Sequence, residues 1–474
     1  MATGLPELDL LEAAAALRAG ETSPTELLAA TLARIERLEP QLHAYVRVLA
    51  DSAARQAQRA EQEIARGEAR GPLHGVPIAV KDLCATKGVP TASGTTVMAD
   101  RRPDHDATVV EKLVEAGAVI VGKTMLTEGA TGEHHPDLVA PVNPWGPDHW
   151  PGVSSSGSGV AVAASLCFGA LGSDTGGSIR FPSAACGVTG IKPTYGRVSR
   201  YGVFPLAASL DHVGPITRSA ADAAALLQVI AGRDPKDPTS LRHVLPDLAR
   251  EQTRGVRGLR IGVDEAYCTE NSDPAVSEAV LAASRVLADL GADLVAVQVP
   301  PWLALARGWN TVCGVEAAMA HAATFPSRAD EYGPRLHAML ERGLRTTGAD
   351  YAAVQAESAA FRGRLGETFE SVDLLLCPSM PMPAPPLALL RQPRGESVPA
   401  SEADAALAPL MKFTAPFDFS GSPTISLPCG FNDGGLPLSL QLIGRHLDEA
   451  TLCRAGHAYQ QATDWHRRRP PLVS

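Results

Sequence analysis

Hydrophobic positions in the first part of the chain recur with a helical period. Leu8, Leu11 and Ala14 are spaced at intervals of three residues, and further leucines fall on the same face. Ser23-Pro24-Thr25-Glu26 then supplies an N-cap residue, a proline for the first turn and an acidic residue. Residues 8–66 are therefore predicted to form helices.

From residue 71 the pattern changes to short apolar runs. Val76–Val80 and Ala118–Val121 have the composition of buried strands, and an amphipathic helix is predicted over 107–116 between them. The order strand, helix, strand returns later in the chain, at 256–263, 277–290 and 293–299. Such alternation predicts an α/β fold with a largely buried sheet.

The rest of the chain adds helices and then strands. Residues 302–370 are predicted to be mostly helical, and 424–427 and 437–442 to be short strands. No internal repeat or long Pro/Gly/Ser linker marks a boundary. We therefore expect one domain over 1–474, with N-terminal helices over 1–66, a catalytic core over 71–220 and a variable helical segment over 302–370.

Composition and charge narrow the class of protein. The 474 residues are 45% hydrophobic and 20% charged, as in globular proteins, and carry 42 basic against 52 acidic residues, a net charge of −10. Partners that prefer a basic face, nucleic acid and anionic membrane, are not expected. The N-terminus lacks the pattern of a signal peptide, and the eight cysteines form no CxxC pair. These features predict reduced cysteines and a cytoplasmic location.

Residues 117–124 satisfy the phosphate-loop pattern GxxxxGK[ST]. In a phosphate loop, however, a flexible loop that binds the anion lies between the two glycines. Here the intervening residues are Ala118–Val121, which have the character of a strand. Nucleotide binding is therefore not predicted at this motif.

Two Ser/Gly-rich clusters fall inside apolar sequence between residues 152 and 200. The first contains Ser154-Ser155-Ser156, and the second is Thr175-Gly176-Gly177-Ser178. One interpretation is a pair of turns that flank a core helix. The other is chemical, because unpaired hydroxyls are costly in a buried setting and the second cluster could direct successive backbone N–H groups at one point, as an oxyanion hole requires.

A serine nucleophile also needs a base, and no histidine lies in either cluster. Lys81 closes the apolar run Val76–Val80, where burial would disfavour its charged form and leave a neutral amine. By strand alternation, Asp82 should point to the opposite face. Alone, a lysine at such a position is more often a surface residue whose stem covers apolar neighbours.

With these blocks the chain resembles the amidase signature family. The matching blocks, in the family's order, include Gly71 to Asp82, Gly122-Lys123-Thr124, Asn143-Pro144-Trp145, Gly152 to Pro182, Gly187 to Thr194, Asp211 to Pro215 and Gly421-Ser422-Pro423. The resemblance implies a large mixed central sheet flanked by helices on both faces. It also implies a Ser–cis-Ser–Lys triad of Ser178, Ser154 and Lys81, an oxyanion hole at Thr175–Ser178, and no metal or organic cofactor.

Several residues depart from the family pattern. Val153 and Ser156 replace glycines around the serine pair, and Met125 stands where the family has asparagine. Glu128-Gly129 replaces Glu-Phe, and His134 and His135 follow in the same stretch. Because this stretch lines the acyl pocket in similar enzymes, we expect Met125, Glu128, Gly129, His134 and His135 to form the substrate pocket. The alternative for the histidine pair is a solvated turn.

The resemblance implies hydrolysis of an amide-type carbon–nitrogen bond of a small molecule, with hydrazides and carbamates as further options. Ser178 would form the acyl-enzyme, and Ser154 and Lys81 would relay the proton. One alternative is the amidase subunit of a glutamine-dependent tRNA amidotransferase. Another is a non-catalytic binding protein on the same scaffold. A homodimer is left open.

Overall fold

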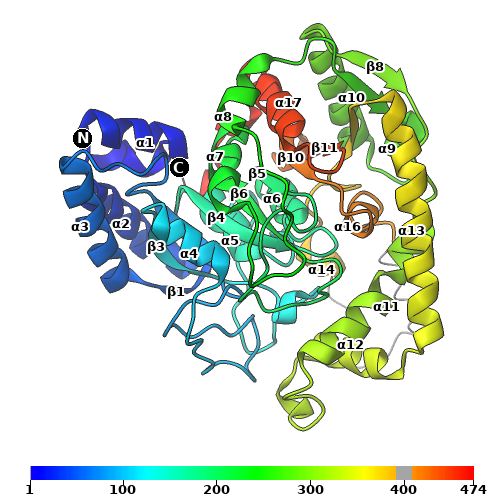
Figure 1. Cartoon of the computed structure of the whole chain (residues 1–474), viewed down its shortest axis with the longest axis horizontal. Coiled ribbons are helices and arrows are strands. Elements are labelled where there is room, and N and C mark those ends of the chain that lie inside the picture. Colours follow the sequence, from blue (N-terminus) through cyan, green and yellow to red (C-terminus); the bar gives the residue numbers. More distant parts are fainter. Residues whose placement is uncertain (1, 391–407, 474) are drawn as a thin grey trace.

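The computed structural model describes residues 2–390 and 408–473, and its central feature is a sheet of eleven strands within these ranges. The sheet crosses the middle of the molecule, with helices packed around it (Figure 1). Its strands lie in the order β1 (Tyr45–Val48), β3 (Val119–Thr124), β2 (Pro77–Lys81), β4 (Gly169–Asp174), β6 (His212–Thr217), β5 (Thr189–Lys192), β10 (Thr424–Phe431), β11 (Pro437–Gly444), β9 (Leu374–Pro378), β7 (Arg260–Val263) and β8 (Asp293–Ala296).

The sheet is mixed, which confirms the predicted fold class. Strand β2 pairs in parallel with β3 and β4, and β7 pairs in parallel with β8 and β9. The other pairings are antiparallel. The sequence did not predict β4, whose Gly169–Asp174 segment is poor in β-branched residues. It becomes a strand because two neighbours, β2 and β6, bond to its two edges.

Both faces of the sheet are covered. Along β2, Ile78 and Val80 pack into one apolar cluster and Ala79 packs into another, as alternation along a strand requires. The first cluster includes residues of α1 (Leu10–Ala19), α4 (Thr108–Glu115), α7 (Ala220–Ile230), α10 (Pro274–Asp289) and α17 (Glu449–Ala462). The second includes residues of α2 (Pro24–Leu42), α3 (Ala50–Ala65) and α5 (Ser156–Ala163).

The N-terminal helices form largely as predicted. Helix α2 begins at Pro24, and the Ser23 side chain accepts a hydrogen bond from the Glu26 N–H. Sequence analysis missed β1, a short strand at the sheet edge between α2 and α3. The two chain ends lie on the same side of the molecule (Figure 1), where Arg34 donates to the carbonyl of Val473 at 3.1 Å.

The segment 302–370 is mostly helical, as predicted, with α11 (Leu303–Ala320), α12 (Pro334–Arg345) and α13 (Gly348–Ser371). These three helices lie together beside the sheet in Figure 1. Shorter helices are α6 (Arg180–Cys186), α8 (Leu248–Glu251), α9 (Glu265–Thr269), α14 (Leu387–Leu390) and α16 (Ala415–Phe419). Short 3₁₀ helices occur at Ala2–Glu7, Glu128–Ala130, Gln252–Arg254, Ala329–Glu331, Trp465–Arg467 and Pro471–Val473.

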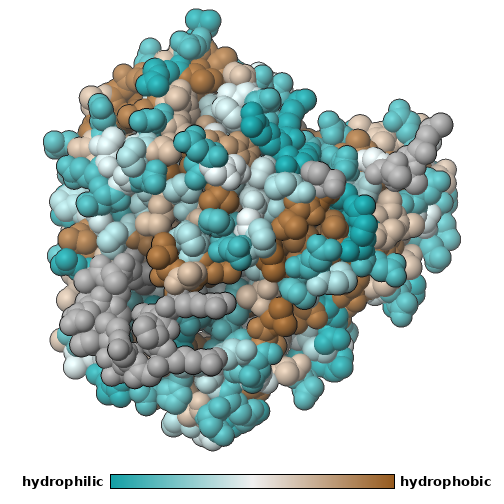
Figure 2. Space-filling model, turned by 180° about the vertical axis from the view of Figure 1, so that it is seen from behind, coloured by the Kyte–Doolittle hydropathy of each residue, from teal (hydrophilic) through white to brown (hydrophobic). Residues whose placement is uncertain are grey.

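The remaining expectations from the sequence have clear outcomes. Strand β3 covers Val119–Thr124, so a strand stands where a phosphate loop would need a flexible turn. The eight cysteines are free and buried. Within 2–390 and 408–473, no helix has both the length and the apolar composition to span a bilayer. On the face seen in Figure 2, hydrophobic residues are interspersed with hydrophilic ones.

Candidate active site

Lys81 and the first serine cluster meet inside the core. Lys81 is the last residue of β2, and Ser154 and Ser155 immediately precede α5. The Lys81 Nζ donates to Ser154 Oγ at 2.7 Å, to Ser155 Oγ at 2.9 Å and to Ser173 Oγ at 2.8 Å. The three N–H bonds of an ammonium thus have three hydroxyl acceptors. The peptide bond between Val153 and Ser154 is cis.

Burial sets the charge of this lysine. The Lys81 side chain is fully buried, and desolvation lowers its pKa to about 7, against opposing attraction from Cys84, Asp174 and Asp211. A large fraction of Lys81 is therefore neutral near pH 7, and a neutral amine can accept a proton from Ser154. Asp82, the next residue, does not stabilise the ammonium because its carboxylate contacts Lys123 Nζ at 3.2 Å.

The second cluster forms a tight turn between β4 and α6, held from within by Asp174. The Asp174 carboxylate accepts hydrogen bonds from the N–H groups of Gly177 at 2.6 Å and Ile179 at 2.9 Å. Gly177 has a φ of 130°, and a side chain there would collide with the Phe181 ring. Of the N–H groups in Thr175–Ser178, the one of Gly177 is thus already bonded to the protein.

The carbonyl groups of the turn are held from outside. Trp309 of α11 donates to the Thr175 carbonyl at 2.8 Å, and Thr414 donates to the Gly176 carbonyl at 2.7 Å. The Gly177 carbonyl accepts from the Phe181 N–H at 2.7 Å.

These contacts fix the direction of the N–H groups. In a trans peptide the N–H points opposite to the C=O. The Gly176 N–H therefore points away from Trp309, and the Ser178 N–H points away from Phe181. Among the described residues, neither N–H has a protein acceptor. Both are available to an oxyanion, which fits part of the predicted hole.

A buried ion network fixes Asp174 itself. Arg180 Nη2 lies 2.8 Å from Asp174 Oδ1 and 2.6 Å from Asp418 Oδ2, and all three side chains are inaccessible to solvent. Burial alone would raise the pKa of Asp174, but the Arg180 guanidinium and the turn N–H groups together hold it well below its usual range. Asp174 is therefore a permanent anion that holds the turn.

Accessibility separates the three predicted catalytic residues. Lys81 and Ser154 are fully buried, whereas Ser178 keeps 8% of its surface exposed. The Ser178 carbonyl accepts from the Ser155 N–H at 3.3 Å, so the backbone joins the two clusters. Of the three, only Ser178 keeps any surface exposed to solvent, whereas Ser154 and Lys81 are closed off from water.

Three of the predicted pocket residues lie along one segment beside this centre. The Met125 carbonyl accepts from the Gly157 N–H at 3.0 Å, so Met125 supports the start of α5. Glu128 is buried, accepts the Gly333 N–H at 3.0 Å, and has a pKa raised to about 7 by desolvation. Gly129 has a φ of 55° and faces Leu336, where a Cβ would be 2.7 Å from a methyl group.

The two histidines of this segment have different surroundings. His134 Nε2 lies 3.0 Å from Ser156 Oγ, and burial lowers the pKa of His134 to about 4, so the ring is neutral. His135 Nδ1 accepts the Asp137 N–H at 3.1 Å, and its Nε2 lies 3.4 Å from Thr96 Oγ1. His134 therefore contacts the first residue of α5, whereas His135 contacts Asp137 and Thr96 in neighbouring loops.

Sequence analysis missed the residues that position this centre. Ser155 belongs to the first cluster, and Ser173 lies two residues before the second, so their nearness to Ser154 and Asp174 was the available signal. Trp309 and Thr414 lie far along the chain and carried no local signal. As to metals, the described ranges contain no group of three or more His, Cys, Asp or Glu side chains that could hold an ion.

Comparisons with known proteins identify relatives along nearly the whole chain. The family model "Amidase" matches residues 26–453. The protein named "Putative amidase AmiD" of Mycobacterium tuberculosis is 48% identical over 471 residues, 99% of this chain and 97% of that protein. A glutamyl-tRNA(Gln) amidotransferase subunit of Chloroflexus aurantiacus is 40% identical over 497 residues, 99% of this chain and 100% of that protein.

A solved structure is similar over the same extent. The structure of 6-aminohexanoate cyclic dimer hydrolase with its substrate superimposes with a TM-score of 0.90 at 31% identity. The match covers 99% of this chain and 100% of that chain.

Proposed function

This chain belongs to the amidase signature family, and we propose that it hydrolyses the amide bond of a small molecule through an acyl-enzyme on Ser178. As an amidohydrolase it acts on carbon–nitrogen bonds. The residue roles, the small-molecule substrate and the single-domain organisation are our proposals.

The mechanism builds on the contact between Lys81 and Ser154. Ser178 Oγ attacks the carbonyl carbon, Ser154 accepts the Ser178 proton and passes its own proton to Lys81 Nζ. The N–H groups of Gly176 and Ser178 stabilise the tetrahedral oxyanion. The carbon–nitrogen bond then breaks as Ser154 returns a proton to the leaving amine, and water hydrolyses the ester by the same relay in reverse.

One observation carries this proposal. Lys81 Nζ lies 2.7 Å from Ser154 Oγ in a fully buried setting, with a pKa near neutrality. A charged structural lysine in the core would be expected to pair with a carboxylate. Here the three hydrogen bonds of the amine all go to hydroxyl groups, which supports its use as a base. The same contact argues against a non-catalytic binding protein.

A second candidate is the amidase subunit of a glutamine-dependent tRNA amidotransferase. It is favoured by 40% identity to the Chloroflexus amidotransferase subunit over 99% of this chain. The altered residues Met125 and His134 argue for a different acyl pocket. We therefore keep this function as the alternative.

Net charge and the state of the cysteines support proposals about partners and location. A net charge of −10 supports the absence of a nucleic-acid partner. Eight free, buried cysteines support a reducing compartment, and we propose the cytoplasm. The open question of a homodimer is answered by light scattering of the purified chain.

The test is turnover by the isolated chain. Purified wild type and Ser178→Ala are compared on a panel of small amides, hydrazides and carbamates, with glutamine included. Turnover of a small amide that the variant lacks supports the proposal. Activity on glutamine alone favours the amidotransferase role, and activity equal in both proteins refutes the role of Ser178.

A further inference from the structure

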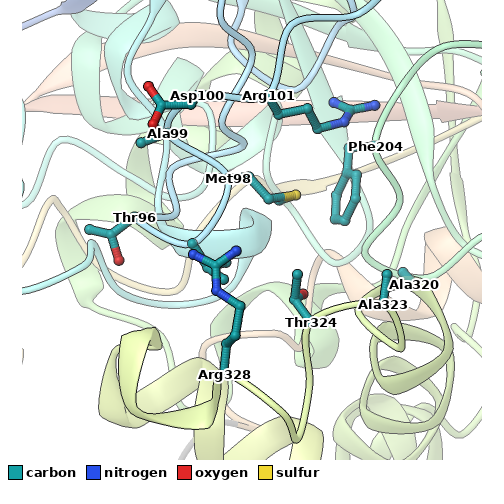
Figure 3. Close-up of a pocket in the computed structure, with 11 residues that line it drawn as sticks. Thr96, Met98, Ala99, Asp100, Arg101, Phe204, Ala320, Ala323, Thr324 and Arg328 are labelled. Atoms are coloured by element: carbon teal, nitrogen blue, oxygen red, sulfur yellow. The ribbon is translucent and has the colours of Figure 1, made fainter.

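A cavity of about 470 Å³ lies apart from the catalytic relay. It opens between residues 96–101, Phe204, and the end of α11 with the loop after it (Figure 3). None of its lining residues belongs to either serine cluster. Its volume falls in the range of ordinary small-molecule sites.

The cavity adjoins the segment predicted to form the substrate pocket. Thr96, one of its lining residues, lies 3.4 Å from His135 through their side chains. Phe204, on the opposite wall, packs edge to face against His321 with 5.0 Å between ring centroids. His321 in turn lies beside Gly129. The cavity therefore lies next to the segment 125–135, which is predicted to form the substrate pocket.

Arg101 is the distinctive group of this cavity. Its guanidinium lies 5.6 Å from the centre of the Phe204 ring, a cation–π contact. Among the described residues the guanidinium donates one hydrogen bond, a long one of 3.4 Å to the Thr91 carbonyl, and forms no ion pair with a carboxylate. The donor edge of a planar guanidinium is thus left for a ligand.

The backbone holds Arg101 in place before any ligand arrives. The Thr91 N–H donates to the Arg101 carbonyl at 2.9 Å, and the Arg101 N–H donates to the Met98 carbonyl at 2.9 Å. The Met98 N–H donates to Thr95 Oγ1 at 3.2 Å. Because the loop is closed on itself, a ligand need not order it, which favours binding.

The other charges at the cavity do not cancel Arg101. Arg328 forms a rim ion pair with Glu331, and both side chains are well exposed. The Asp100 carboxylate points away from the Arg101 guanidinium (Figure 3). Met98, Phe204 and alanines supply apolar walls. Among the described residues the Arg101 guanidinium thus has no carboxylate partner and lies beside the Phe204 ring, which suits a monoanion with a compact apolar body.

We propose that this cavity binds a small carboxylate, with its carboxylate on Arg101 and its apolar body against Phe204 and Met98. A guanidinium and a carboxylate match in a paired, two-bond geometry. The ligand could be the remote carboxylate of an amide substrate or a separate carboxylic acid. The proposal concerns binding and does not depend on the catalytic roles.

The test is calorimetric titration of the whole chain with phenylacetate, and with 2-phenylethanol as the neutral probe. Wild type should bind phenylacetate saturably and more tightly than 2-phenylethanol. Arg101→Gln should weaken phenylacetate by about tenfold or more, since a hydrogen bond to a charged group is lost. Arg102→Gln is the matched control, because Arg102 does not line the cavity and bonds the Gly88 carbonyl instead.

A second variant tests the cavity without changing charge. Ala323 lines the cavity and is exposed, so Ala323→Phe should fill the space, leave the fold intact by circular dichroism, and abolish binding. The proposal is overturned if wild type shows no saturable binding. It is also overturned if either Arg101→Gln or Ala323→Phe binds phenylacetate as wild type does.

Inhibition kinetics distinguish the two sources of the carboxylate. If phenylacetate raises the KM of a carboxylate-bearing amide in wild type but not in Arg101→Gln, the cavity holds the remote end of the substrate. If it alters kcat without raising KM, again only when Arg101 is present, the cavity holds a separate ligand. Either result supports the site.

Discussion

Ser173→Ala tests the protonation of Lys81 while leaving Ser178, Ser154 and Lys81 themselves unchanged. Ser173 Oγ accepts one of the three hydrogen bonds of Lys81 Nζ, at 2.8 Å. An ammonium depends on that acceptor more than a neutral amine does. Removing the hydroxyl should therefore destabilise the charged form and lower the pKa of Lys81 further.

The pKa of Lys81 in the wild type sets the expected pH dependence of kcat/KM. Its pKa of about 7 lies well below the ordinary value because of burial. If the neutral amine is the active form, kcat/KM should rise about tenfold per pH unit below 7 and level off above about pH 8. One lost hydrogen bond to a charged group should move the midpoint down by about one pH unit.

The assay is kcat/KM of an accepted amide from pH 5 to 9 for wild type, Ser173→Ala and Ser183→Ala. Ser183 is the matched control, since it is equally buried but bonds the Ile179 carbonyl. Asp211, whose pKa burial raises to about 6, would also give a rising limb. Its contact is with Thr175, so its midpoint should not respond to Ser173.

Three results would refute this reasoning. A wild-type profile that is flat down to pH 5 would mean that no base titrates near neutrality. A kcat/KM that still rises about tenfold per pH unit at pH 9 would point to a lysine near its free pKa, about 10.4, and would mean that burial does not set the charge. A midpoint equal in wild type and Ser173→Ala would assign the limb to another group.

Other substitutions test the remaining roles. Ser178→Ala should lower kcat by a factor on the order of 10⁶ with the fold intact, and a residual activity of one tenth would exclude Ser178 as nucleophile. Trp309→Phe removes the donor to the Thr175 carbonyl, so kcat should fall about 10- to 100-fold with KM little changed. The control Trp302→Phe should leave kcat unchanged, and an unchanged kcat in Trp309→Phe would contradict the positioning role. His134→Ala should raise KM or shift substrate preference. His135→Ala should lower the free energy of unfolding by about 1–3 kcal/mol, measured by denaturant titration. If both variants behave as wild type, the pair is a simple turn.

The pattern of residues along the chain predicts the fold class, and together with the family resemblance it predicts the candidate chemistry. Strand β2 is predictable because Val76–Val80 is a continuous apolar run, and the same run makes Lys81 at its end a candidate for desolvation, with a surface lysine as the alternative. The serine clusters were recognisable because hydroxyls and glycines inside apolar sequence need a reason. Such signals are local, since they depend on neighbours along the chain.

Some elements carried no such signal. Strand β4 has a sequence of small residues and becomes a strand through β2 and β6. Ser156 was noted as an extra hydroxyl, but only the fold shows that it contacts His134 and not Lys81. Specificity in such enzymes is expected to come from loops outside the shared motifs, here including 378–412, and part of that loop, 391–407, lies outside the described residues.

The tertiary structure alone decided how the turn at Thr175–Ser178 is held. Trp309 and Thr414 are separated from it by well over a hundred residues, and each holds one carbonyl of the turn. Arg101 and Phe204 likewise share a cavity wall although they lie on different loops. The physical reason is that peptide orientation and cavity shape depend on packing between distant segments. Periodicity along the chain reports which face of each segment is buried, but not which side chain it will meet.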